Sequence, residues 1–226
     1  MQKKLIFALI LIFIPILLVF GVLYKINFGI VSTVVIMLSM LPFFMQFENK
    51  KPKARDIVPI AVMAAVAVAS RLAFAFIPQF KPIIAVVIVT AVVFGAESGF
   101  LCGTVSMLVS NFFFGHGPYT PWQMFFCGII GFMAGFLASK GLLKNRILLS
   151  LFGFAAGFVF GAAVDIFTVI AYTPQISVAT VLGIYIAGFW FNVVLAAATA
   201  FFLYVAGIPI IKKLKRVQLK YGINEK

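Results

Sequence analysis

The residues with the greatest chemical capacity in this chain gather in one stretch, residues 111–124, which reads Asn-Phe-Phe-Phe-Gly-His-Gly-Pro-Tyr-Thr-Pro-Trp-Gln-Met. Pro118, Pro121 and the two glycines interrupt a helix. The amide, imidazole, phenol and indole groups offer hydrogen bonds and flat faces for stacking. We interpret the stretch as a loop that contacts a ligand. The alternative is a tight interfacial turn in which Tyr119 and Trp122 are membrane-surface aromatics.

Few residues of the chain could catalyse a reaction. The acids are Glu48, Asp56, Glu97, Asp165 and Glu225, and the single histidine is His116. Paired carboxylates for hydrolysis, an H-E-x-x-H zinc motif and a Walker A phosphate loop all lack the residues they need. Cys102 and Cys127 fall in apolar segments without metal-binding spacing, so we expect buried structural thiols. The sequence therefore predicts no catalytic residue, no metal site and no cofactor.

Arg71 and Asp165 are ionisable groups inside apolar segments, where a charged side chain costs at least about 2.5–3.5 kcal/mol unless it is paired or hydrated. Each lies six residues from the outward end of its segment, about 9 Å along a helix. Three roles are compatible with this matched depth: an ion pair between two helices, direct contact with a ligand, or a proton relay.

Other polar and aromatic residues are expected near the same outward ends. Most of the polar ones are neutral, which suits an amphipathic molecule held by stacking and hydrogen bonds better than a small ion. With Arg71 and Asp165, the candidate binding residues are Gln79, Lys81, Asn111, Phe114, His116, Tyr119, Trp122, Gln123, Tyr172 and Asn192.

The elements that position these residues are membrane helices. Hydrophobic residues make up 64% of the chain and charged residues 10%, a composition that cannot build a water-facing surface. We predict an all-α integral membrane protein of about eight spans, two of them short and joined by a tight cytoplasmic turn at Glu97-Ser98. The predicted spans are residues 5–23, 28–47, 57–77, 82–96, 99–114, 122–139, 147–171 and 180–211.

The basic residues predict the orientation, because lysine and arginine are retained on the cytoplasmic side. In the eight-span arrangement, 15 of the 18 basic residues fall on one side together with both termini. The loops at residues 78–81, 115–121 and 172–179 then face outward. The net charge of +13 reflects this topology and contact with anionic lipid, and we exclude a nucleic-acid partner.

The charged linker at residues 48–56 divides the chain into a leading pair of helices (1–47), a six-helix core (57–211) and a basic cytoplasmic tail (212–226). On the first core helix, four alanines spaced by four residues form a face of small side chains on which another helix could pack closely. They are Ala61, Ala65, Ala69 and Ala73. This face contacts either the chain's own helices or a partner subunit. We assign the glycines spaced by four on later spans to internal packing.

Several segments together resemble the substrate-binding S components of energy-coupling factor (ECF) vitamin transporters. The similarity runs from residue 47 to residue 201, and the branch assigned to cobalamin uptake is the most similar. It rests on Phe47-Glu48-x-x-Lys51-Pro52-x-Ala54-Arg55, the alanine-rich helix that ends in Arg71, the Pro78-Gln79-Phe80-Lys81-Pro82 loop and the loop at residues 110–124.

This resemblance implies a subunit that binds a vitamin near the outer surface of a prokaryotic plasma membrane, through the three outward loops. It also implies that the alanine face meets a membrane scaffold subunit coupled to two cytoplasmic ATPases, which is consistent with the missing Walker A motif. Cobalamin is the expected substrate, and riboflavin, a queuosine precursor or thiamine is the alternative. Competing hypotheses are an integral-membrane enzyme that uses His116 and Asp165 as an acid–base pair, and a structural membrane scaffold without a ligand.

Overall fold

A computed structural model describes residues 2–45, 54–173 and 175–222, which are helical throughout apart from short connections. The helices are α1 (Gln2–Leu23), α2 (Phe28–Met45), α3 (Ala54–Ala73), α4 (Ile83–Phe94), α5 (Ala96–Phe114), α6 (Tyr119–Ser139), α7 (Arg146–Tyr172), α8 (Val178–Phe202), the π-helical segment η1 (Leu203–Gly207) and α9 (Ile208–Tyr221). Residues 48–53 of the predicted linker at 48–56 lie outside the described residues, as do the last residues of the tail, 223–226. The end of the predicted linker is wrong, because residues 54–56 already form the first turn of α3.

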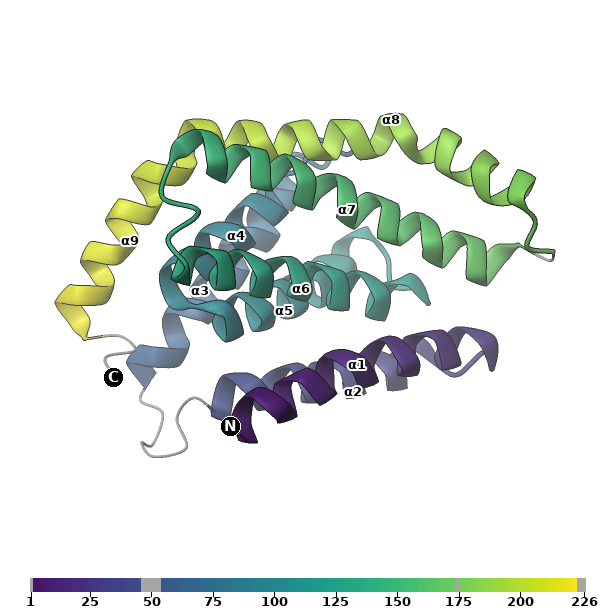
Figure 1. Cartoon of the computed structure of the whole chain (residues 1–226), viewed down its shortest axis with the longest axis horizontal. Helices are drawn as coiled ribbons and strands as arrows, with labels where there is room; N and C mark the ends of the chain where they lie inside the picture. The colour runs from purple at the N-terminus through teal and green to yellow at the C-terminus, as the bar shows by residue number, and fades with distance from the viewer. Residues whose placement is uncertain (1, 46–53, 174, 223–226) are drawn as a thin grey trace.

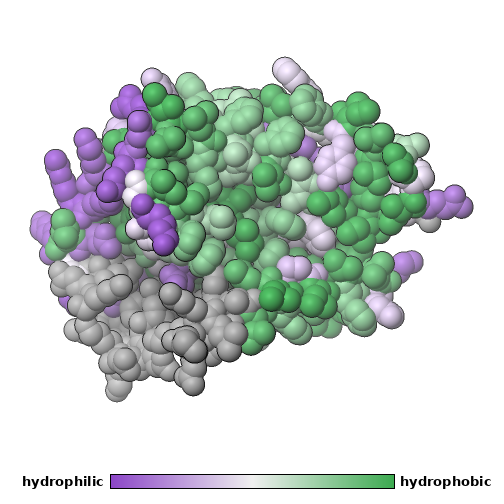
Figure 2. All heavy atoms as spheres, viewed as in Figure 1, coloured by the Kyte–Doolittle hydropathy of each residue, from purple (hydrophilic) through white to green (hydrophobic). Residues whose placement is uncertain are grey.

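The prediction of an all-α membrane protein is confirmed. Within the described residues, the helices long and apolar enough to cross a bilayer are α3, α6, α7 and the continuous helix from Val178 to Tyr221, and shorter apolar helices accompany them. Figure 2 shows hydrophobic residues around the middle of the molecule, with hydrophilic residues gathered at the end where α9 lies. The start of α1 and the end of α9 lie at this same end (Figure 1), as the basic residues predict for the cytoplasmic side.

The short pair of helices forms as predicted, but the predicted position of the turn between them is wrong. A single residue, Gly95, separates α4 from α5, and its φ of 98° is one that other residues rarely adopt. Its N–H donates to the carbonyl of Ala91 at 2.9 Å. Glu97 belongs to the first turn of α5, where its negative charge is favourable beside the helix N-terminus.

The glycines spaced by four on α6 and α7 pack against neighbouring helices of the same chain, as predicted. A Cβ on Gly135 would lie 2.5 Å from the Cα of Ala96, and a Cβ on Gly157 would lie 2.8 Å from the Cα of Ala196. These distances are shorter than van der Waals contact, so α6 meets α5, and α8 meets α7, backbone to backbone. The two helix pairs form the framework that carries the polar residues.

The leading hairpin of α1 and α2 packs along the core rather than standing apart from it (Figure 1). Ile10, Ile14 and Leu18 are buried along one side of α1 and belong to the same hydrophobic cluster as the core helices. Leu9 and Ile12 lie on the opposite side and are more than half exposed, which suits contact with lipid. The hairpin is therefore an integral layer of the fold.

Candidate substrate-binding site

Arg71 organises a polar cluster at the outward end of the core. It lies in the last turn of α3 and reaches α5, where its Nη1 donates to Ser110 Oγ and, at 2.8 Å, to Asn111 Oδ1. All hydrogen bonds of Arg71 to described residues leave from Nη1. The Nε and Nη2 groups of the guanidinium therefore have no partner among the described residues.

Asn111 connects this arginine to α6 and is almost fully buried, with 1% of its surface exposed. While its Oδ1 accepts from Arg71, its Nδ2 donates to Thr120 Oγ1 at 3.0 Å and to Gln123 Oε1 at 2.9 Å. Every hydrogen-bonding atom of the amide is thus occupied, and the end of α5 is fixed against the start of α6. The sequence placed Asn111 and Gln123 in the site, and the structure brings them together.

The predicted loop 115–121 is shorter than expected, because α6 already begins at Tyr119. Gly115 has a φ of 97°, and Tyr119 closes the turn by donating its hydroxyl to the carbonyl of Gly115 at 2.8 Å. The ring of Tyr119 lies against Gly117, where a Cβ would be only 2.5 Å from it. Tyr119 thus holds the loop in shape, and its hydroxyl is already occupied.

Phe114 is the aromatic centre of the cluster. The guanidinium carbon of Arg71 lies 4.4 Å from the ring centroid, and the ammonium nitrogen of Lys81 lies 4.5 Å from it. Burial lowers the pKa of Lys81 below its ordinary value of 10.5, and the charge of Arg71 lowers it further. Two cations thus share one aromatic ring, and no described carboxylate forms a salt bridge with either of them.

His116 and Gln79 lie in the two loops that flank this cluster. The imidazole of His116 meets Phe112 edge-on, at 4.4 Å between centroids, and its Nε2 is buried without a hydrogen-bond partner in the described structure. Gln79 is exposed and adopts a φ of 56°, in a tight turn where the N–H of Lys81 donates to its carbonyl. The first and second predicted outward loops therefore both border the Arg71 cluster.

Asp165 forms a second polar centre, between α7 and α8. Its Oδ2 accepts from Nδ2 of Asn192 at 2.6 Å. Gly188 makes room for the carboxylate, since a Cβ there would lie 2.7 Å from both carboxylate oxygens. The proposed ion pair between Arg71 and Asp165 is not formed, because each group has a different neutral partner.

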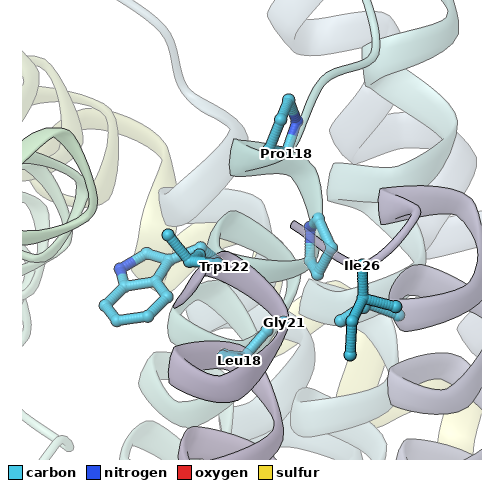
Figure 3. Close-up of a pocket in the computed structure, with 8 residues that line it drawn as sticks. Leu18, Gly21, Ile26, Pro118 and Trp122 are labelled. Carbon is cyan, nitrogen blue, oxygen red and sulfur yellow. The ribbon is translucent and has the colours of Figure 1, made fainter. Parts of the chain in front are cut away.

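Trp122 has a structural position. It is 5% exposed, and its indole N–H donates to the carbonyl of Ala163 at 2.6 Å, which joins α6 to α7. Figure 3 shows Trp122 and Pro118 beside Leu18 and Gly21 of the leading hairpin, around an apolar cavity of about 20 Å³. This space holds little more than a water molecule, so it is not a vitamin site.

Tyr172, the last predicted site residue, is 63% exposed at the end of α7, where its ring packs edge-on against Phe167.

Sequence reasoning overlooked Ser110 and Thr120, the hydroxyl partners in the Arg71 cluster. One signal was available for Ser110: Cys102, Ser106 and Ser110 follow each other at four-residue spacing and therefore share one face of α5.

Together the fold and the site define a multi-pass membrane protein with a donor-rich, aromatic cluster at its outward face. A protein-family model described as "ECF-type riboflavin transporter, S component" matches residues 51–216, well over half of the 226 residues. The chain therefore belongs to this family of transporter components of the cell membrane. No curated protein and no solved structure gives a significant match.

The family assignment confirms the resemblance to ECF S components, but it does not confirm the cobalamin-specific branch. It also identifies the chain as part of a transporter rather than an enzyme. In the described structure the His116 ring meets Phe112 and the Asp165 carboxylate accepts from Asn192.

Proposed function

We propose that this chain is the substrate-binding subunit of an ATP-driven vitamin importer and that the cluster of Arg71, Lys81 and Phe114 is where the vitamin binds. The cluster lies at the outward ends of α3, α5 and α6, where a ligand arriving from outside first meets the protein. Asn111, Gln123 and His116 border it, and Gln123 and His116 offer neutral groups for further hydrogen bonds.

The observation that carries this proposal is that Arg71 and Lys81 are held in place while several of their N–H groups have no hydrogen-bond acceptor among the described residues. Nη1 anchors Arg71, while its Nε and Nη2 keep three N–H groups without a described acceptor. Lys81 likewise donates no side-chain hydrogen bond to a described residue, although its ammonium lies over Phe114. Anchored donors beside an aromatic face suit a flat molecule with carbonyl or anionic acceptors, because little conformational freedom is lost on binding.

Riboflavin is the vitamin that we propose first. Its flavin ring is flat and carries carbonyl acceptors, which match the donors of Arg71 and Lys81 and the ring of Phe114. The family description adds support, since it names riboflavin transporters. Thiamine is disfavoured because its positive charge would meet two cations.

Cobalamin is the second candidate, and a separate observation favours it. The loop at residues 110–124 and the Pro78–Pro82 loop resemble the cobalamin branch, and many of the groups near the cluster are neutral, as the amide-rich periphery of cobalamin requires. Gln123 and Gln79 are the neutral groups on the two sides of the cluster.

We further propose that α3 docks the scaffold subunit that couples the importer to two ATPases. Its four alanines, Ala61, Ala65, Ala69 and Ala73, are all exposed. The opposite side of α3, which includes Ile60 and Ala67, is buried against the core. An exposed face of small residues permits close approach of another helix in the membrane.

One experiment tests both the site and the ligand. Riboflavin and cobalamin are titrated separately into the purified full chain, and into Arg71→Gln and Lys81→Gln variants. We expect one of the two vitamins to bind the unmodified chain and to lose at least tenfold in affinity in each variant, since a hydrogen bond to a charged group is worth about 1.5–3 kcal/mol. Replacement of Lys25, an outward lysine remote in sequence from the cluster, by Gln is the control. Unchanged affinity in both variants would place the site elsewhere.

A further inference from the structure

A cavity of about 210 Å³ lies at the cytoplasmic end of the molecule, where α4, the connection between α6 and α7, and α9 meet. Its wall combines apolar and basic side chains, among them Leu143, Ile208, Ile211, Lys144, Lys212 and Lys215. Leu143 and Ile211 are buried, whereas the three lysines are exposed, so the cavity has an apolar floor and a cationic rim. Its size exceeds a packing defect, because about 10–15 Å³ of such space is enough to hold one water molecule.

We propose that this cavity binds one anionic phospholipid of the cytoplasmic leaflet. The phosphate lies among Lys144, Lys212 and Lys215, and the glycerol and the first part of an acyl chain lie against Leu143 and Ile211. The inference is independent of the vitamin site, which lies at the opposite, outward end of the helices.

Charge complementarity is the first argument for a phosphate group. The residues that line the cavity include three lysines and no carboxylate. The lysines come from two separate segments, the α6–α7 connection and α9, so the fold brings them together around one space. Basic pockets between transmembrane helices on the cytoplasmic side are suited to anionic headgroups.

The second argument is the position of the cavity relative to the lipid-facing surface. Leu142 and Ile210 are sequence neighbours of lining residues and expose 52% and 40% of their surfaces, so apolar surface continues beyond the cavity. Figure 2 shows the hydrophilic end of the molecule adjoining the hydrophobic belt. A ligand with a charged head and an apolar tail fits this boundary, whereas a free anion would use only the rim.

The third argument is that α9 is anchored where it approaches the cavity. In η1, which precedes α9, Leu203 is fully buried, and a Cβ on Gly207 would lie 3.0 Å from Cδ2 of Leu149 on α7. This close contact fixes the start of α9. Lys212 and Lys215 therefore belong to a helix with a defined position and not to a free tail.

Native mass spectrometry of the purified full chain, in neutral detergent with either phosphatidylglycerol or phosphatidylcholine added, tests the proposal. We expect one retained phosphatidylglycerol and at least a tenfold preference over phosphatidylcholine. Combined Lys144→Gln, Lys212→Gln and Lys215→Gln substitutions should remove that preference, at about fivefold per lysine. The matched control removes the same charge from residues of α9 that do not line the cavity: Lys213→Gln, Arg216→Gln and Lys220→Gln.

An Ile208→Trp variant keeps every charge and fills the apolar part of the cavity, so it should also reduce phosphatidylglycerol retention at least tenfold. The Ile208→Trp variant therefore tests the same site if the triple lysine variant does not fold. Equal losses in the cavity variant and the control variant would overturn the proposal in favour of diffuse attraction. Displacement of the lipid by an equal concentration of inorganic phosphate would overturn it in favour of a free-anion site.

Discussion

Replacing Asn111 by Leu tests the outward cluster most directly, because this one side chain joins α3, α5 and α6. The substitution removes the bond from Arg71 at 2.8 Å and the bonds to Thr120 and Gln123 at 3.0 and 2.9 Å. Leucine has similar bulk, so the packing of the buried position changes little.

The cost follows from the three lost bonds. One bond to a charged donor is worth about 1.5–3 kcal/mol and each neutral bond about 0.5–1.5 kcal/mol, which gives a range of about 2.5–6 kcal/mol. Arg71 keeps its bond to Ser110, so we expect the lower part of that range, about 3 kcal/mol. If the ligand requires the ordered cluster, its affinity falls by about 150-fold.

The assay combines equilibrium binding of the vitamin with thermal unfolding of the detergent-solubilised chain. Asn111→Asp is an informative companion, since it keeps an acceptor for Arg71 and loses the two amide donors. Gln218→Leu on α9 serves as a control for a polar-to-leucine change far from the cluster. A vitamin affinity within twofold of the unmodified chain in Asn111→Leu would refute the reasoning.

Three further results are expected. Ala65→Leu combined with Ala69→Leu should abolish vitamin uptake and co-purification of the ATPases, while the vitamin affinity of the isolated chain stays within twofold. Loss of vitamin binding while the chain still co-purifies with the ATPases would exclude a docking role. Vitamin affinity should fall as the pH rises through the pKa of Lys81, which lies below 10.5, and Lys81→Arg should remove this dependence. Arg71→Ala and Asp165→Ala should each lower the free energy of unfolding, and the loss in the double variant should equal the sum of the two single losses within about 0.5 kcal/mol. A loss in the double variant that is smaller than this sum would show that the two side chains do interact.

The sign of the pH effect follows from the direction of the pKa shift. The folded chain disfavours the protonated form of Lys81, so proton loss begins at a lower pH in the folded state than in the unfolded state. Stability therefore rises slightly as the pH passes from the folded pKa toward 10.5, while a donor to the ligand is lost. Opposite trends in stability and affinity distinguish this cause from general unfolding at high pH.

Composition and hydropathy were sufficient to predict the helical membrane fold, because long continuous apolar segments suit membrane helices, in which every backbone polar group is satisfied within the segment. The outward loop was also predictable, since its proline, glycine and polar residues interrupt apolar segments. The position of the turn at Gly95 was missed because Glu97 is more polar, although only a glycine readily adopts the positive φ found there.

The pairing of Arg71 with Asp165 was predicted from a matched depth that the structure does not keep, because α3 ends two residues after Arg71 and α7 ends seven residues after Asp165. Depth alone would also not have been sufficient. Distance along a helix fixes one coordinate, whereas contact also depends on which way each side chain faces. Asp165 instead lies in a space that Gly188 leaves open, and such a space depends on how α7 packs against α8. The hydroxyl partners in the Arg71 cluster were missed for a related reason, because serine and threonine are common in membrane helices and do not mark a site by themselves.

The π-helical segment η1 has a consequence for how the C-terminal sequence can vary. A π turn contains one residue more than the α-helical path requires, and one residue corresponds to about 100° of rotation around a helix. Deleting a single residue from 203–207 would therefore return this turn to the α-helical path and keep Lys212 and Lys215 near the α6–α7 connection. Deleting one residue from the regular part of α9 before Lys212 would instead turn both lysines by roughly that angle. The π turn is thus the place where the C-terminal helix can lose one residue without turning the lysines that follow.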